Sequence, residues 1–195
     1  MDVAIITLPL TPQLTIELTD EQFFQLCQNN RDLRFERTKL GELIIMPPTG
    51  GETGRRNARI IQRLLNWADT DGTGIAFDSS TCFKLPNGAE RSPDASWVKK
   101  ERWNALTLEQ KEKFPPLCPD FVVELRSPSD SLEKVRSKMQ EYMENGAILG
   151  WLINPKNKQV EVYRLNQDVE ILENPTTLLG ENVLPGFVLS LKQII

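Results

Sequence analysis

The stretch FVVEL, residues 121–125, decides the fold and points to the site. Its apolar run predicts a short buried strand. The carboxylate inside it, Glu124, is costly to bury unless a partner or a ligand compensates its charge. By strand alternation Glu124 shares one face with Val122 and Arg126. The alternative is that this face meets solvent and that Glu124 pairs with Arg126 or another neighbour.

The segments around this strand predict an α/β protein. Helices are predicted from about 52 to 68, and from a capping box at Asp130 and Glu133 to a closing glycine, Gly146. The pairs of segments 33–37 with 42–46, and 148–153 with 159–163, predict hairpins. Strand, helix and strand between hairpins indicate an α/β sandwich around a mixed sheet.

Composition restricts the class of protein. A chain of 195 residues that is 39% hydrophobic and 26% charged is typical of one soluble globular domain. We expect an irregular arm at residues 1–14 and one domain at residues 15–195. No apolar run approaches the ~20 residues of a membrane span, and the N-terminus does not resemble a signal peptide. Its three separated cysteines predict reduced thiols. We therefore expect a cytoplasmic protein without membrane contact.

The absence of histidine excludes several kinds of catalysis. Ser-His-Asp and Cys-His nucleophilic mechanisms and His-ligated zinc all require that residue. Carboxylates, Lys, Arg and Tyr remain, together with an oxygen-ligated metal such as Mg²⁺ or Mn²⁺. Because the net charge is −4, any nucleic-acid site must be local.

Two Pro-Asp pairs offer a second carboxylate for a site at Glu124. Asp120 lies on the Glu124 face by parity, but four strand residues place its Cα about 13 Å away. Asp94 can come from a neighbouring strand, where it would lie beside Glu124. We therefore prefer Asp94 as the partner and interpret Asp120 as a residue of the turn before the strand.

Further charged residues lie on the two main predicted helices. Lys138 flanks an apolar stripe and could reach over the sheet edge; a solvated lysine beside Glu141 is the alternative. Glu52 opens the earlier helix, where an acid also complements the helix dipole. A basic stripe with i, i+4 spacing could hold backbone phosphates or could simply be solvated. Its members are Arg55, Arg59 and Arg63.

Taken together, these segments resemble the PD-(D/E)XK nuclease superfamily and, within it, the Uma-two branch of restriction-endonuclease-like proteins. The resemblance covers roughly residues 15–190. It rests on MPPTGGE at 46–52, Pro93-Asp94, PDFVVELRSP at 119–128, Lys138, Tyr142, Gly146 and 151–153. It implies a restriction-endonuclease-like αβββαβ core with a mixed central sheet, helices on its faces and added β-hairpins.

The resemblance also implies roles for individual residues. Asp94 and Glu124 match the motif acids, and Glu52 matches the acid on the first core helix. The motif lysine normally stands two residues after the acid, where this chain has Arg126. In the Uma-two branch the lysine is found on the following helix, where Lys138 is the matching residue. Arg126 remains a rival for that role.

We therefore expect a Mg²⁺-dependent (or Mn²⁺-dependent) endonuclease that hydrolyses double-stranded DNA. We also expect a homodimer, because nucleases that cut both strands often work as two-fold pairs. Asp94 and Glu124 would bind the metal with the backbone carbonyl of Leu125, and Glu52 would add a ligand directly or through water. Lys138 would orient water or stabilise charge. The residues expected to contact DNA are Arg55, Arg59, Arg63 and Arg126.

Two other functions stay open at this point. The chain could be a non-catalytic nucleic-acid or protein-binding module on a nuclease-like fold, which the acidic balance and Arg126 favour. It could also be a phosphohydrolase for small molecules, although it lacks a glycine-rich phosphate-binding loop.

Overall fold

The computed structural model describes residues 18–195, so the predicted irregular arm at residues 1–14 lies outside the described residues. A six-stranded sheet in the order β10-β9-β8-β7-β6-β3 forms the centre. In it β7 and β8 are parallel, and the other neighbouring pairs are antiparallel. Its strands are β3 (Gly74–Asp78), β6 (Ala95–Lys99), β7 (Phe121–Leu125), β8 (Leu149–Asn154), β9 (Gln159–Arg164) and β10 (Glu170–Glu173).

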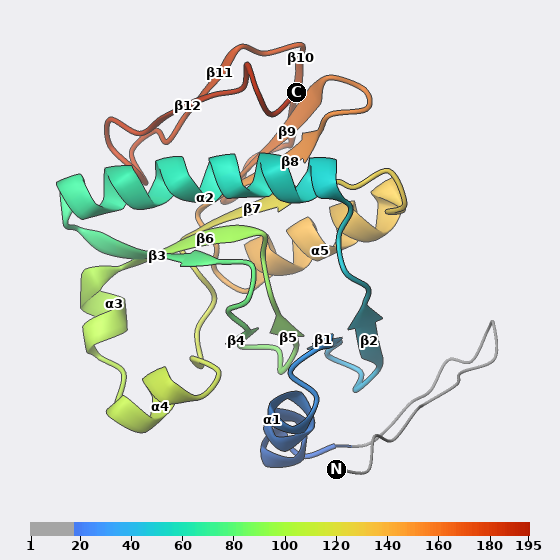
Figure 1. Ribbon diagram of the computed structural model, residues 1–195. Coiled ribbons are helices and arrows are strands. Elements are labelled where there is room, and N and C mark those ends of the chain that lie inside the picture. Colours follow the sequence, from blue (N-terminus) through green and yellow to red (C-terminus); the bar gives the residue numbers. More distant parts are fainter. Residues whose placement is uncertain (1–17) are drawn as a thin grey trace.

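Two long helices cover opposite faces of this sheet. On one face, α2 (Gly51–Asp71) packs Ile60 and Leu64 into a core that contains Val123 (Figure 1). On the other face, α5 (Leu132–Glu144) packs Met139 and Tyr142 into a core that contains Val122. Neighbouring residues of β7 therefore face different cores, and every residue of this strand is buried. The alternative of a solvent-exposed face for β7 is wrong.

The chain order α2, β3, β6, β7, α5, β8 gives the predicted αβββαβ core with its mixed sheet. The fold class is thus confirmed. Local signals explain much of it, since both predicted hairpins form: β1 pairs with β2, and β8 with β9. Gly146 follows the end of α5 with a φ of 104°, a left-handed conformation that suits glycine.

A second, four-stranded sheet lies beside the core in the order β2-β1-β5-β4 (Figure 1). Its strands are β1 (Arg34–Arg37), β2 (Leu43–Met46), β4 (Phe83–Lys84) and β5 (Glu90–Arg91). The helix α1 (Asp20–Asn29) begins at a capping box of Thr19 and Gln22 and buries Phe23 against Phe35 of β1. This sheet contacts the core through Glu36 of β1, which pairs with Lys138 of α5 at 2.7 Å.

The remaining elements complete the surface. Between β6 and β7 lie α3 (Lys100–Asn104) and α4 (Leu108–Glu112), and Thr107 caps α4. After β10, the strands β11 (Thr177–Leu179) and β12 (Val188–Ser190) pair with each other. The sequence did not predict β11, because its three residues carry too short a pattern.

The predicted start of α5 is wrong by one residue. Ser131, not Asp130, is the N-cap, and its hydroxyl accepts a hydrogen bond from Lys134 N. The carboxylate of Asp130 instead accepts from Ser127 N at 2.8 Å. Asp130 therefore closes the turn before the helix. Both residue types can cap, and the geometry of the preceding turn decides between them.

Candidate active site

Strand pairing brings Asp94 to Glu124. In the antiparallel pair of β6 and β7, Ala95 lies opposite Val123, so the next step along the chain places Asp94 opposite Glu124. The backbone N–H of Leu125 donates to Asp94 Oδ2 at 2.8 Å, which orients this carboxylate. The preference for Asp94 over Asp120 thus agrees with the register of the sheet.

Glu124 lies in a buried, polar pocket on the α5 face. Its side chain makes two polar contacts from α5: Lys138 Nζ lies 2.8 Å from Oε1, and the hydroxyl of Tyr142 donates to Oε1 at 3.1 Å. Only 7% of the residue is exposed. Burial, with added repulsion from Asp94 and Glu36, raises the pKa of Glu124 to about 8, although Lys138 opposes this rise.

Lys138 connects two carboxylates. Its ammonium lies 2.8 Å from Glu124 Oε1 and 2.7 Å from Glu36 Oε1, and it donates to the carbonyl of Ser92 at 3.1 Å. Burial disfavours the charged form, but Glu124 and Glu36 outweigh burial and raise the pKa of Lys138 above its usual value. The alternative of a solvated lysine beside Glu141 does not describe this contact set.

Glu36 is the site residue that sequence reasoning missed. It comes from β1, and only 3% of it is exposed. Burial raises its pKa, but Lys138 and Arg91 outweigh burial, so the net pKa is lowered. The available signal was a carboxylate inside a short strand, the same signal that drew attention to Glu124. The sequence could not show that this hairpin reaches Lys138.

A cleft of about 320 Å³ opens beside Asp94, between the N-terminal half of α2 and residues 78–79. From α2, Asn57 donates through Nδ2 to Asp94 Oδ1 over a long 3.5 Å. The oxygen of the same amide, Oδ1, is buried and has no hydrogen-bond partner. Burial raises the pKa of Asp94, while the N–H of Leu125 opposes that rise. An unpaired acceptor beside a carboxylate suits a cation or a donor.

Glu52, in contrast, lies at the surface. Its carboxylate pairs with Arg55 at 2.7 Å and with Arg56 at 3.3 Å, and these pairs lower the pKa of Glu52. Since the side chains are exposed or partly exposed, these ion pairs contribute little to stability. The helix residue that contacts Asp94 is therefore Asn57 rather than Glu52.

The four predicted DNA-contacting arginines have different surroundings. Arg55 pairs with Glu52, and Arg59 contacts Gln62 at 3.5 Å. Arg63 donates to the carbonyl of Ser190 and so ties α2 to β12.

The fourth of them, Arg126, donates to the carbonyl of Asp130 at 3.2 Å and to Asn154 Oδ1 at 3.3 Å. Its guanidinium is therefore engaged with the turn before α5 and with β8. Lys138, rather than Arg126, contacts Glu124.

Asp120 has the structural role that the sequence favoured. It is buried, accepts from Lys99 N at 2.8 Å and pairs with Arg102 at 2.9 Å. These contacts join the start of β7 to the end of β6. In residues 18–195 the three cysteines are free thiols, and no three side chains of His, Cys, Asp or Glu cluster closely enough to hold a metal by themselves.

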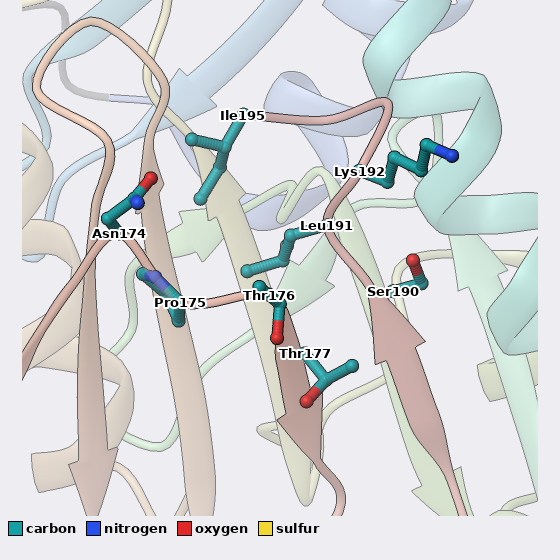
Figure 2. A pocket seen from close by; sticks show the side chains of 8 residues that line it. All are labelled: Asn174, Pro175, Thr176, Thr177, Ser190, Leu191, Lys192 and Ile195. Atoms are coloured by element: carbon teal, nitrogen blue, oxygen red, sulfur yellow. The ribbon is translucent and has the colours of Figure 1, made fainter.

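A second hollow, of about 370 Å³, lies near the C-terminus and is shown in Figure 2. Residues 174–177 and 190–192 and Ile195 line it. Lys192 is its one charged side chain, and no acidic side chain lines it. It therefore lacks the acids that hydrolytic chemistry at a phosphate would require in a chain without histidine.

Comparison with known proteins agrees with this architecture. The family model "Uma2: Putative restriction endonuclease" matches residues 20–192, so the chain belongs to this family. The fold is similar to the crystal structure of a putative nuclease belonging to DUF820 from Anabaena variabilis ATCC 29413. The TM-score is 0.75 at 21% identity, and the match covers 91% of this chain and 97% of that chain.

A search among curated proteins found no match. Within residues 18–195, no helix has both the length and the apolar character needed to cross a membrane. The family and the fold together define a nuclease-like protein.

Proposed function

We propose that this chain is a Mg²⁺-dependent or Mn²⁺-dependent endonuclease that hydrolyses phosphodiester bonds in double-stranded DNA. The observation that carries the proposal is the meeting of Asp94, Glu124 and Lys138 at one end of β6 and β7. Two carboxylates that can hold a metal ion, together with an ammonium, can support phosphodiester hydrolysis without histidine.

The charges around this point favour a divalent cation. Two carboxylates, those of Glu124 and Glu36, contact the single ammonium of Lys138, which also influences the pKa of Asp94. Arg91 is shared between Glu36 and Glu141. Burial, with a smaller contribution from neighbouring carboxylates, raises the pKa of Asp94 and of Glu124. A bound cation would stabilise the ionised form of both carboxylates and so lower their pKa values.

The donor atoms also suit Mg²⁺ or Mn²⁺. Asp94 and Glu124 would hold the ion, and the unpaired Oδ1 of Asn57 is a third oxygen beside Asp94. The carbonyl of Leu125 remains a candidate ligand, whereas Glu52 would have to leave its arginine partners. A bound metal would lower the pKa of a water molecule and offset charge on the phosphate.

The protein's own groups would place the substrate. Lys138 is held as an ammonium, and could therefore stabilise negative charge that grows on the phosphate. Exposed members of the basic stripe on α2, Arg55 and Arg59, could contact backbone phosphates outside the cleft. Such contacts would hold DNA without reading its sequence.

A plasmid cleavage assay tests this proposal. Supercoiled DNA should be nicked or linearised with Mg²⁺ or Mn²⁺, and EDTA should stop the reaction. Asp94→Ala combined with Glu124→Gln should lower the rate by at least about 100-fold, because the metal would lose both of its acids. Asp120→Asn is the matched control, since Asp120 is a buried carboxylate that pairs with Arg102 at 2.9 Å before the opposite end of β7.

A non-catalytic DNA-binding module is the second candidate. It is favoured by the absence, within residues 18–195, of a preformed group of three acidic metal ligands. Salt-dependent DNA binding by a folded protein that neither cleaves DNA nor binds Mg²⁺ or Mn²⁺ in calorimetry would support the module and overturn the nuclease proposal.

A further inference from the structure

We propose that Glu36 is a positioning residue, which holds the ammonium of Lys138 against Glu124. The inference deepens the proposed nuclease function and rests on it. Glu36 belongs to the four-stranded sheet, so that sheet would complete the active site rather than merely flank the core.

The first step of the argument is the hydrogen-bond capacity of Lys138. An ammonium has three N–H donors, and three acceptors surround this one: Glu36 Oε1, Glu124 Oε1 and Ser92 O. All three contacts are between 2.7 and 3.1 Å. These three contacts therefore fix the position of the ammonium at the end of a long, flexible side chain. Without Glu36, the carboxylate that faces Glu124 across the ammonium is lost.

The second step is that Glu36 is itself held in place. Its Oε1 accepts from Ser92 N at 2.9 Å, and its Oε2 lies 3.2 Å from Arg91 Nη1. The Nε of Arg91 in turn pairs with Glu141 of α5 at 2.6 Å. Both oxygens of Glu36 are thus bound by groups at the end of β5, directly before Asp94. A carboxylate anchored in this way can fix a lysine within a small range of positions.

The third step distinguishes positioning from a purely structural ion pair. Glu36 and Glu141 are both partners of Arg91 and both join distant elements, but only Glu36 contacts Lys138. If the network serves stability alone, neutralising either acid should lower the free energy of unfolding and leave the cleavage rate unchanged. If Glu36 positions Lys138, only the change at Glu36 should alter the ammonium and the cleavage rate.

The experiment compares Glu36→Gln with the matched control Glu141→Gln. The first readout is the ¹⁵N NMR signal of the Lys138 ammonium, assigned by its loss in Lys138→Arg. This signal should be visible in the parent and in Glu141→Gln, because hydrogen-bonded ammonium protons exchange slowly with water. It should be lost in Glu36→Gln. The second readout is kcat for plasmid cleavage, which should fall about 10- to 100-fold in Glu36→Gln alone.

The two readouts separate the two hypotheses. An unchanged ammonium signal and an unchanged kcat in folded Glu36→Gln would overturn the positioning role. Equal losses in both variants would overturn it too, because a structural network would then suffice. If the parent does not cleave DNA, the proposed function fails, and the ammonium signal still decides whether Glu36 holds Lys138.

A variant that retains the charge covers the case in which Glu36→Gln does not fold. Glu36→Asp draws the carboxylate back by one methylene group and keeps it negative. The Lys138 signal should then weaken, and kcat should fall by a smaller factor than in the neutral variant. A folded Glu36→Asp with the parent's signal and rate would overturn the proposal.

Discussion

Glu124 illustrates how one residue can connect stability with function. A carboxylate buried in β7 is unfavourable for folding. The same burial disfavours its charged form and raises its pKa to about 8. Lys138 and Tyr142 compensate only part of this cost. Carboxyl groups with strongly shifted pKa values are concentrated at functional sites. Catalysis and metal binding use buried carboxylates, although burying them is unfavourable for folding.

The first residue-scale prediction concerns the pH dependence of stability. In the unfolded chain Glu124 titrates near 4.5, and in the metal-free folded protein near 8. The unfolded chain therefore loses its proton first, so stability decreases as pH rises from about 4.5 through 8. Glu124→Gln cannot titrate. At pH 8.5 in EDTA it should be more stable than the parent by more than about 1 kcal/mol.

Urea unfolding at several pH values measures this difference. The two proteins should have nearly equal stability near pH 4, where the parent's carboxyl is protonated in both states. A stability difference that does not depend on pH would contradict the assignment of the raised pKa to Glu124. Asp168→Asn, an exposed acid near β10, is the control for a general charge effect.

At the scale of elements, the start of α5 shows how local geometry determines which residue caps a helix. The hydroxyl of Ser131 accepts from Lys134 N, while the neighbouring Asp130 binds Ser127 N in the preceding turn. This helix carries Lys138 and Tyr142, so its start sets the register of both site residues. Close packing against β8 reinforces that register, because a Cβ on Gly150 would lie 2.6 Å from Met139 Cε.

The element-scale prediction is a test of this cap. Ser131→Ala should lower the free energy of unfolding by about 1 kcal/mol, because Lys134 N loses its side-chain acceptor. Thermal or urea unfolding measures the loss. Ser129→Ala removes a neighbouring exposed hydroxyl that makes no capping contact and should change stability by less than about 0.5 kcal/mol. Equal effects of the two changes would argue against Ser131 as the cap.

At the scale of the whole molecule, the six-stranded sheet ends at β10. Within residues 18–195 this strand has one paired neighbour, β9, and its Ile171 is 52% exposed. An exposed edge with apolar side chains is suited to pairing with another strand. An endonuclease that cuts both strands of DNA can use a two-fold dimer, so we propose that this edge pairs with its copy in a second chain.

Light scattering tests the dimer. The parent should have twice the mass of one chain at micromolar concentration, and Ile171→Lys should shift it toward the monomer because it places a charge on the edge. Leu108→Lys, at an exposed leucine on α4, is the matched control and should leave the mass unchanged. A parent that is monomeric at the concentration of the cleavage assay would rule out the dimer.

Local signals made much of this protein predictable. The apolar run around Glu124, the periodicity of α2, the hairpin pairs and the caps at Thr19 and Thr107 each depend on residues close in sequence. They predicted an α/β sandwich around a mixed sheet, and the resemblance to the PD-(D/E)XK superfamily added the αβββαβ order. The ~13 Å between Asp120 and Glu124 along the strand favoured Asp94 as the neighbour. The position of Lys138 beside the apolar stripe of its helix allowed both a solvated lysine and one that reaches the site, and only the resemblance favoured the site.

The tertiary structure alone decided which other groups join them. Glu36, Arg91 and Asn57 belong to elements that are distant from β7 in sequence, and their contacts depend on how two sheets and α2 pack together. Local patterns carry no information about such packing. Short-range periodicity thus determined the helices, the strands and the α/β class, and the motifs of the resemblance singled out the two acids, whereas long-range packing determined what compensates their charge.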